Sequence, residues 1–270
     1  MTRDPAGRQP RPVGTVTRGT TAPRRLRRVD AWIAANLGDR LRVAADPLVV
    51  DLGFGAAPVT TTELLAGLSS TVGQRLRVIG LDIDPARVAL ATEVAADPPR
   101  LDFGTGGFEL AGVRPVVVRA MNVLRQYDEA AVGPAWATMT AALAPGGVLV
   151  EGTCDETGRL ATWVAVDARG PRSLTLSAAL PALGSPATLA QRLPKALIHR
   201  NVPGERVHDL IEALDRGWRG AAPYAALGPR QRWWHTIAAL RDAAWPVVGG
   251  PGRWHRGEVT LRWSAVAPGP

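Results

Sequence analysis

The stretch VVDLGFGAAPVTTTELL, residues 49–65, combines the end of an apolar run with a glycine turn and the start of a helix. The apolar run ends at Asp51, and Gly53 and Gly55 follow with one residue between them. Glycine has no Cβ, so a turn built from it lets the backbone approach a small ligand closely. Pro58 suits the first turn of the helix that follows. This stretch therefore predicts a strand, a ligand-binding turn and a helix in succession.

Strand-like and helix-like segments alternate around this stretch. After a first amphipathic helix over 24–37, apolar strands are predicted at 47–53, 76–84, 114–123 and 144–153, separated by helices at 59–70, 85–95 and 129–143. Apolar strands separated by helices of this length are typical of a parallel sheet covered on both faces. We therefore predict an α/β fold with a doubly wound, mostly parallel sheet and a C-terminal helical insertion or lid.

The rest of the chain has a different pattern. Strands are expected at 159–167 and 172–180, helices between 186 and 245, and a last strand at 257–266. The predicted segments are a flexible basic arm (1–22), a Rossmann-like cofactor-binding domain (23–185), a helical substrate-side segment (186–256), and a final strand returning to the sheet with its tail (257–270).

The second predicted strand ends at Asp82, close to the glycine turn in a doubly wound sheet. Ligands of such sheets bind beyond the carboxyl ends of the strands, where the strand order reverses. A carboxylate there can accept hydrogen bonds from both hydroxyls of a ribose. The nicotinamide or flavin dinucleotide fingerprint is a weaker match, because Pro58 replaces its third glycine and Asp82 lies 27 residues after Gly55.

Taken together, VVDLGFGAAP, VIGLDIDPARVALA and LAPGGVLVEGT resemble the first motif, the second motif and the later helix–turn–strand of class I S-adenosylmethionine-dependent methyltransferases. The resemblance covers about residues 45–155, and Ala57 stands where the family has a third glycine. It implies S-adenosylmethionine as cofactor. The residues that it implies for the cofactor site are Asp51, Gly53, Phe54, Gly55, Asp82, Ile83, Phe108 and Glu109.

The fourth strand of this family carries residues that face the substrate. Near its end the chain has Asn122, Arg125 and Tyr127, which are candidates for positioning an acceptor. The alternative is that they only cap the next helix. Cys154 follows the next strand, where RNA cytosine-C5 methyltransferases carry their nucleophile, although the Pro-Cys motif of those enzymes is absent. A lone cysteine at a strand end is more often a small buried hydrophobic residue.

The charge of the chain is concentrated at its ends. Residues 1–30 hold eight arginines against two aspartates, whereas residues 31–185 hold 12 basic and 16 acidic residues. The basic C-terminal part also has six of the nine tryptophans, several beside arginine. Arginine interleaved with aromatic residues can bind RNA, although tryptophans on amphipathic helices more often pack in the core.

Several classes of protein fit the sequence less well. No apolar run is long enough for a membrane helix, and the single cysteine fits a reducing compartment, so a cytoplasmic protein is expected. The four histidines lack metal-type spacing, so no metal site is expected. The predicted function is S-adenosylmethionine-dependent methyl transfer, with RNA slightly favoured over a small molecule as acceptor. The alternative is a non-catalytic cofactor-binding protein that acts as an RNA-binding or regulatory module.

Overall fold

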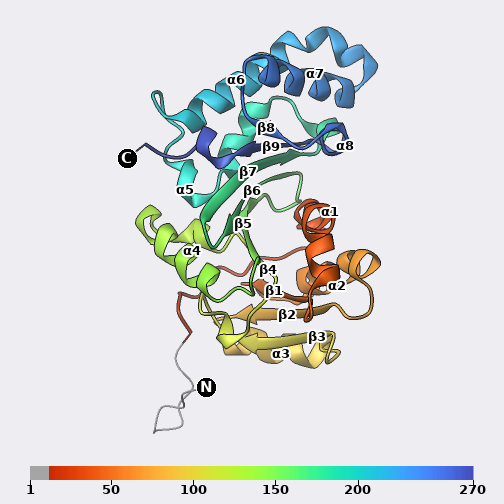
Figure 1. Ribbon diagram of the computed structural model, residues 1–270, viewed down its shortest axis with the longest axis vertical. Helices are drawn as coiled ribbons and strands as arrows, with labels where there is room; N and C mark the ends of the chain where they lie inside the picture. Colours follow the sequence, from red (N-terminus) through yellow and green to blue (C-terminus); the bar gives the residue numbers. More distant parts are fainter. Residues whose placement is uncertain (1–11, 270) are drawn as a thin grey trace.

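Nine strands form one sheet in the computed structural model, which describes residues 12–269 (Figure 1). The strands are β1 (Leu48–Leu52), β2 (Arg77–Asp82), β3 (Leu101–Thr105), β4 (Val117–Met121), β5 (Val148–Cys154), β6 (Leu160–Asp167), β7 (Gly170–Ala178), β8 (Val247–Val248) and β9 (Glu258–Arg262). Their order across the sheet is β3-β2-β1-β4-β5-β6-β7-β9-β8. The predicted α/β fold is confirmed.

The first five strands are parallel and doubly wound. β1 pairs with β2 on one side and with β4 on the other. The chain therefore moves outward from β1 to β3 and returns to the other side of β1 as β4. The strand order reverses between β1 and β4, which is where this class of sheet opens a crevice beyond its strand ends.

The other half of the sheet is antiparallel, and the sequence predicted its strands β6, β7 and β9 but not the two-residue β8. β6 pairs antiparallel with β5, β7 with β6, and β9 with both β7 and β8. The sequence also missed β3, whose residues lie in the glycine-rich passage before residue 112. β3 is short and only its inward-facing Leu101 and Phe103 are buried apolar residues, so it lacks a continuous apolar run.

Helices cover both faces of the sheet (Figure 1). They are α1 (Arg27–Val43), α2 (Val59–Val72), α3 (Pro85–Ala95), α4 (Val132–Ala141), α5 (Lys195–Ile198), α6 (Arg206–Gly220), α7 (Pro229–Asp242) and α8 (Pro251–Trp254). Side chains alternate across the strands, so Val49 packs with α1 and α2 while its neighbour Val50 packs with α4. No helix within residues 12–269 combines the length and apolar character needed to cross a membrane.

The helical segment that was predicted as a lid does not lie over the crevice as one unit. α6 and α7 pack against each other at the end of the molecule farthest from β3 (Figure 1), and their buried side chains join the core of the antiparallel half. The part of this segment that reaches the crevice is the 3₁₀ helix Pro186–Arg192. The helical periodicity of α6 and α7 identified two helices, but it could not indicate which part of the sheet they would cover.

Candidate functional site

The loop after β1 lies at the switch point and takes the sharp turn that its glycines predict. Gly53 and Gly55 have φ angles of 71° and 89°, a region that side chains with a Cβ rarely adopt. Gly53 N–H donates to the carbonyl of Leu81 at 2.7 Å, which ties the loop to β2. A Cβ on Gly53 would approach Cγ2 of Val123 to 2.7 Å, so glycine is needed here for space as well as for φ.

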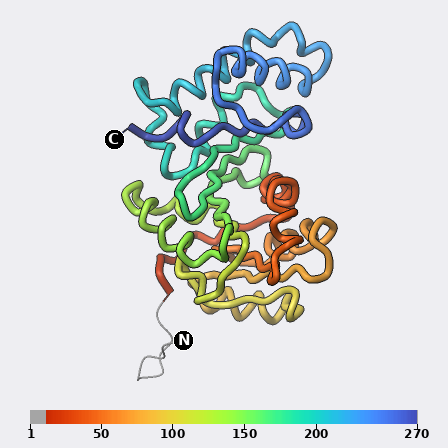
Figure 2. The backbone as a smooth tube through the Cα atoms, in the orientation of Figure 1, coloured from red at the N-terminus to blue at the C-terminus, as the bar shows by residue number. Residues whose placement is uncertain are grey.

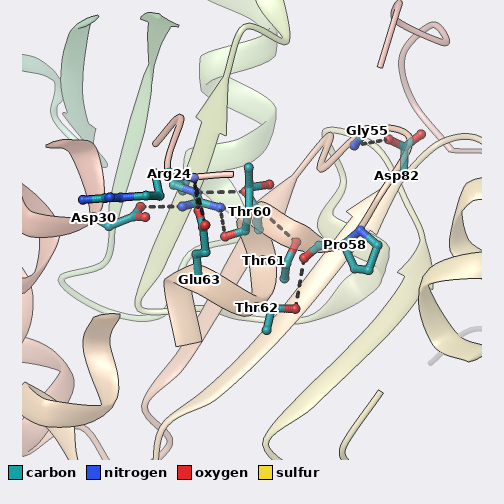
Figure 3. Close-up of polar contacts among 11 residues, drawn as sticks. Arg24, Asp30, Gly55, Pro58, Thr60, Thr61, Thr62, Glu63 and Asp82 are labelled. Carbon is teal, nitrogen blue, oxygen red and sulfur yellow. Dashed lines mark hydrogen bonds and ion pairs between the residues drawn. The ribbon is translucent and has the colours of Figure 1, made fainter. Parts of the chain in front are cut away.

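Asp82, the last residue of β2, faces the same loop and is 2% exposed. Its Oδ2 accepts a hydrogen bond from Gly55 N–H at 3.2 Å (Figure 3). Its Oδ1 accepts one from Asp84 N–H at 3.0 Å. A carboxylate has roughly four lone-pair positions. Nη1 of Arg87 also lies 3.5 Å from Oδ2 of Asp82. These three contacts leave the carboxylate of Asp82 with part of its acceptor capacity toward the crevice.

A small cavity of about 30 Å³ lies beyond Asp82, and Ile83 and Phe108 are among its lining residues. Glu109 lies beside it, where its Oε1 accepts a hydrogen bond from Gly107 N–H at 2.8 Å. Phe54, by contrast, is buried on the opposite face of the sheet and packs edge-on against Phe103, with 5.3 Å between ring centroids. The structure thus gathers most of the predicted cofactor residues at one edge of the sheet.

The N-terminal segment lies across this edge. We call residues 12–21 the strap; in Figure 2 it is the red stretch between the grey residues and α1. Val13 N–H donates to Oε2 of Glu109 at 2.8 Å, and Val13 C=O accepts from Phe108 N–H at 2.9 Å. A Cβ built on Gly14 would lie 3.7 Å from Ile83 and 3.9 Å from Phe108. The strap thus occupies most of the space around the predicted cofactor residues.

Further hydrogen bonds hold the rest of the strap in place. Thr15 N–H donates to the hydroxyl of Tyr127 at 2.6 Å, Arg87 donates to the carbonyl of Thr17 at 2.8 Å, and Ala56 N–H donates to the carbonyl of Gly19 at 2.8 Å. The sequence predicted a flexible arm over 1–22, of which residues 1–11 lie outside the described residues. Composition could not predict this docking, because the strap binds through its backbone and not through apolar side chains.

Asn122 and Cys154 meet at the ends of β4 and β5, beside a second cavity of about 620 Å³. Asn122 Nδ2 lies 3.2 Å from Sγ of Cys154, and Cys154 N–H donates to Oδ1 of Asn122 at 2.9 Å. Asn122 has a φ of 62°, which is uncommon for a residue with a side chain and often marks functional sites. Cys154 is 1% exposed, in keeping with the small buried hydrophobic residue that was the alternative to a nucleophile.

The other two residues predicted to position the acceptor, Arg125 and Tyr127, line different cavities. Arg125 lines the larger cavity, and its Nη1 donates to the carbonyl of Gln191 at 3.3 Å. Tyr127 lines the smaller cavity, where its ring packs on Phe108 with 5.3 Å between centroids. The structure therefore places Tyr127 beside the strap, with Ile83 and Phe108, and Arg125 at the larger cavity.

Asp51, predicted to anchor the loop or the cofactor, forms a buried ion pair. Nη2 of Arg119 lies 2.7 Å from Oδ2 of Asp51, and Arg119 also pairs with Asp30 of α1. The hydroxyl of Thr61 on α2 also donates a hydrogen bond to Asp51 at 2.8 Å. These contacts join α1, α2, β1 and β4 beneath the glycine loop, and Figure 3 labels Asp30 and Thr61 among them. Arg119 itself is fully buried.

Sequence reasoning missed three residues that line the larger cavity, namely Arg18, Arg25 and Arg192. Arg18 belongs to the strap, Arg25 lies two residues before α1, and Arg192 ends the 3₁₀ helix Pro186–Arg192. They are far apart in the sequence, and no motif connects them. Their shared positive charge was visible only as part of the basic character of both chain ends.

The C-terminal tryptophans contribute mainly to the core. Trp218, Trp233 and Trp254 are buried, and Trp234, Trp245 and Trp263 are half-buried and pack against the same core. Arg232 lies 4.0 Å from the centre of the Trp218 ring, so that arginine–tryptophan pairing is intramolecular. Among residues 12–269, no group of three or more His, Cys, Asp or Glu side chains is arranged to hold a metal.

Glu151, in the middle of β5, is a buried carboxyl group away from both cavities. Its Oε2 accepts a hydrogen bond from Trp136 at 3.3 Å, and its Oε1 has no partner within the described part of the chain. Burial raises the pKa of Glu151 to about 8, against the opposing effect of the Trp136 hydrogen bond. The group is therefore protonated at neutral pH in the folded state.

This raised pKa makes a specific prediction for stability. Between pH 4.5 and 8 the folded state holds a proton that the unfolded state has lost, so rising pH destabilises the fold through Glu151. We expect wild type to lose about 2–3 kcal/mol more than Glu151→Gln between pH 5 and pH 7, because each pH unit in this window costs at most about 1.36 kcal/mol. Urea unfolding of both proteins at these two pH values measures it. If both proteins lost the same free energy of unfolding between these pH values, the raised pKa of Glu151 would be contradicted.

Comparisons with known proteins identify solved structures that resemble this chain. A scan against protein-family models gave no match, and a search of curated protein sequences gave none. Solved structures that align with the chain include magnesium protoporphyrin IX methyltransferase from Synechocystis PCC 6803 with bound SAH (21% identity, 47% of this chain and 53% of that chain, TM-score 0.36). The alignment thus spans about half of that protein's length.

Two Streptomyces proteins align over larger shares of their length. DesVI of Streptomyces venezuelae is 17% identical over 90% of this chain and 93% of its own, with a TM-score of 0.35. The CcbJ methyltransferase of Streptomyces caelestis is 19% identical over 57% of this chain and 70% of its own, with a TM-score of 0.37. These likenesses are distant, so the functional conclusion rests on the geometry of the site.

Proposed function

We propose that this protein transfers a methyl group from S-adenosylmethionine to an acceptor. The observation that carries the proposal is the position of the Asp82 carboxylate, hydrogen-bonded to Gly55 N–H at the switch point of a doubly wound sheet. An acid in this place can accept hydrogen bonds from the two ribose hydroxyls of the cofactor. Gly53 and Gly55 leave room for the methionine part, and Ile83 and Phe108 offer apolar surfaces to the adenine.

Glu109 and Phe108 also match the hydrogen-bonding groups of an adenine ring. Adenine has an amino donor next to a ring-nitrogen acceptor on one edge. The Glu109 carboxylate and Phe108 N–H offer the complementary acceptor and donor, and in this structure the N–H and C=O of Val13 bind both. The strap thus makes the two hydrogen bonds that we assign to adenine.

Cofactor binding then requires the strap to move. Ligand cavities usually measure roughly 300–1,000 Å³, whereas the cavity beside Asp82 has about 30 Å³. Displacing Val13 and Gly14 would free Glu109, Phe108 N–H and the space between Ile83 and Phe108. A protein that binds only in the strap-open state shows an affinity reduced by the fraction of molecules in that state.

The cofactor supplies the reactive methyl sulfonium group. When bound, S-adenosylmethionine would offer its methyl carbon to a lone pair of the acceptor, which would lose a proton to solvent, and S-adenosylhomocysteine would be the other product. The protein needs mainly to align the acceptor and to exclude water. Asn122, which lines the larger cavity together with Gly53, is our candidate for positioning the acceptor.

The sequence placed RNA slightly ahead of a small molecule as acceptor. That preference was based on the arginine-rich chain ends and on the C-terminal tryptophans. Because the tryptophans pack in the core, they no longer favour RNA. Strap residues 17–21 also line the larger cavity, whose volume of about 620 Å³ is within the usual range for small-molecule ligands. We therefore favour a small-molecule acceptor.

Calorimetric titration of the full-length protein tests the cofactor proposal. We expect S-adenosylmethionine and S-adenosylhomocysteine to bind with micromolar affinity, about −8 kcal/mol, and NAD not to bind. A radiolabelled methyl group appearing in small molecules or RNA of a cell extract would distinguish an enzyme from the alternative of a non-catalytic cofactor-binding module. Failure of both S-adenosyl ligands to bind would reject the proposed function.

Deletion of residues 1–17 tests whether the strap competes with the cofactor. We expect this variant to bind S-adenosylhomocysteine about five- to tenfold more tightly, on the order of 1 kcal/mol, because the competing backbone contacts are lost. Val13→Ala is the matched control: its side chain is 49% exposed and its contacts with Glu109 and Phe108 are made by the backbone, so it should bind like wild type. Weaker binding by the deletion variant would instead make the strap part of the cofactor site.

A further inference from the structure

The larger cavity has an unusual excess of positive charge. Its lining includes Arg18, Arg25, Arg125 and Arg192, against the acids Asp51 and Glu156. Asp51 is already paired with Arg119, and Glu156 is exposed. Arg25 uses its guanidinium on the carbonyls of Thr20 and Asp155. Within residues 12–269, neither Arg18, Arg125 nor Arg192 forms an ion pair.

Arg192 is held in place by its backbone and not by its side chain. Its carbonyl accepts hydrogen bonds from the hydroxyls of Thr153 and Thr162, which are register partners on β5 and β6. Its guanidinium makes no hydrogen bond to any described residue, and its Nε is buried without a partner. A buried donor without a partner is costly unless a ligand satisfies it.

Arg125 approaches the same cavity from the other side. It follows the buried Leu124, and its one side-chain hydrogen bond goes to the carbonyl of Gln191 at 3.3 Å. Burial, and after it the nearby positive charge of Arg192, lowers the pKa of Arg125. Two guanidinium groups that repel each other at one partly buried position are stabilised when an anion binds between them.

We propose that the larger cavity binds a small-molecule acceptor through a carboxylate or phosphate group, held by Arg125 and Arg192. The role of this ligand as a methyl acceptor rests on the proposed function. The binding of an anion by the two arginines does not. Guanidinium groups bind both kinds of anion in a bidentate manner. The cavity volume of about 620 Å³ is within the usual range for small-molecule ligands. Asn122 and Cys154 line the same cavity beside Gly53, so an acceptor anchored by the arginines reaches the cofactor side of the site.

The test uses simple aromatic probes with the full-length protein. Benzoate and phenyl phosphate represent the two anions, and benzamide is the neutral match for benzoate. Affinities come from ligand-observed NMR, with S-adenosylhomocysteine titrated separately by calorimetry. We expect both anions to bind at least tenfold more tightly than benzamide, and the tighter of the two identifies the anion that the site prefers.

Variants locate the binding site. Arg125→Gln and Arg192→Gln should each weaken binding of the preferred anion about tenfold, while Arg192→Lys, which keeps the charge, should retain part of it. Arg172→Gln is the matched control, since Arg172 lies on β7 with a 53% exposed side chain and belongs to neither cavity. Thermal unfolding of each variant shows whether it is folded, and the Arg192→Lys result separates loss of charge from loss of structure.

The outcomes distinguish this proposal from the proposed function. Equal binding of benzoate and benzamide, or unchanged anion binding in both glutamine variants, would overturn the anion site. Anion binding without any binding of S-adenosylhomocysteine would reject methyl transfer and leave the anion site standing. A short uridine oligonucleotide that binds far more tightly than phenyl phosphate, and depends on both arginines, would overturn the small-molecule proposal in favour of RNA.

Discussion

Asp82→Ala is expected to weaken binding of S-adenosylhomocysteine about a hundredfold. The carboxylate would accept two hydrogen bonds from the ribose, each charge-assisted and together worth about 3 kcal/mol. Its loss would also release Gly55 N–H, which Asp82 holds at 3.2 Å, and so loosen the glycine loop. Calorimetric titration of the variant and of wild type under the same conditions measures the change.

Asp102→Ala is the matched control for this experiment. Asp102 lies on the neighbouring strand β3, is exposed, and makes its one hydrogen bond to the N–H of Phe103. We expect Asp102→Ala to bind S-adenosylhomocysteine like wild type. If Asp82→Ala, still folded by circular dichroism, also bound normally, the ribose contact would be elsewhere and our assignment of the crevice would be wrong.

Arg119→Met is expected to destabilise the fold by about 3–5 kcal/mol, the usual cost of removing one partner from a buried ion pair. It would leave the carboxylates of Asp30 and Asp51 buried together without their cation. At roughly 2–4 °C per kcal/mol, the melting temperature should fall by about 10 °C. Thermal and urea unfolding at pH 7.5 measure the loss.

The pH dependence of this loss identifies its cause. Burial raises the pKa of Asp30 to about 6 even with the attraction of Arg119, so removing Arg119 should raise it further. Carboxyl groups that are protonated no longer repel each other, and the deficit of Arg119→Met should therefore shrink between pH 7.5 and pH 5. The triple variant with Asp30→Asn and Asp51→Asn should recover part of the stability. A deficit that stayed constant with pH would indicate lost packing as the main cause.

The parallel half of the fold was predictable from the sequence because its information is local. Apolar strands, intervening helices and the glycine loop each lie within about ten residues, and the positions of Asp82 and Gly55 follow from them. Asp51 shows the limit of this reasoning. Its partner Arg119 lies on β4, directly opposite in the register, and only the pairing of strands 68 residues apart reveals that the two charges neutralise each other.

The remaining features of the site depend on contacts without a local pattern. Arg125 and Arg192 meet because a 3₁₀ helix after β7 returns to the ends of β4 and β5. The direction in which α6 and α7 pack depends on the antiparallel extension of the sheet, which periodicity does not specify. Hydrophobic patterns thus identified the helices, the strands and the edge of the sheet where we propose that the cofactor binds. The cavity where we propose that the acceptor binds could be found only in the three-dimensional structure.

The strap has a consequence for how this protein varies among its relatives. Its contacts with Glu109, Phe108 and Ala56 are made by backbone N–H and C=O groups, which every residue except proline provides. The side chains at positions 13, 15 and 17 are therefore free to drift during evolution. The length of the strap is constrained instead, together with Gly14 and Gly19, whose φ angles are 138° and 68°. Orthologues should preserve this spacing and these two glycines while the other strap residues diverge.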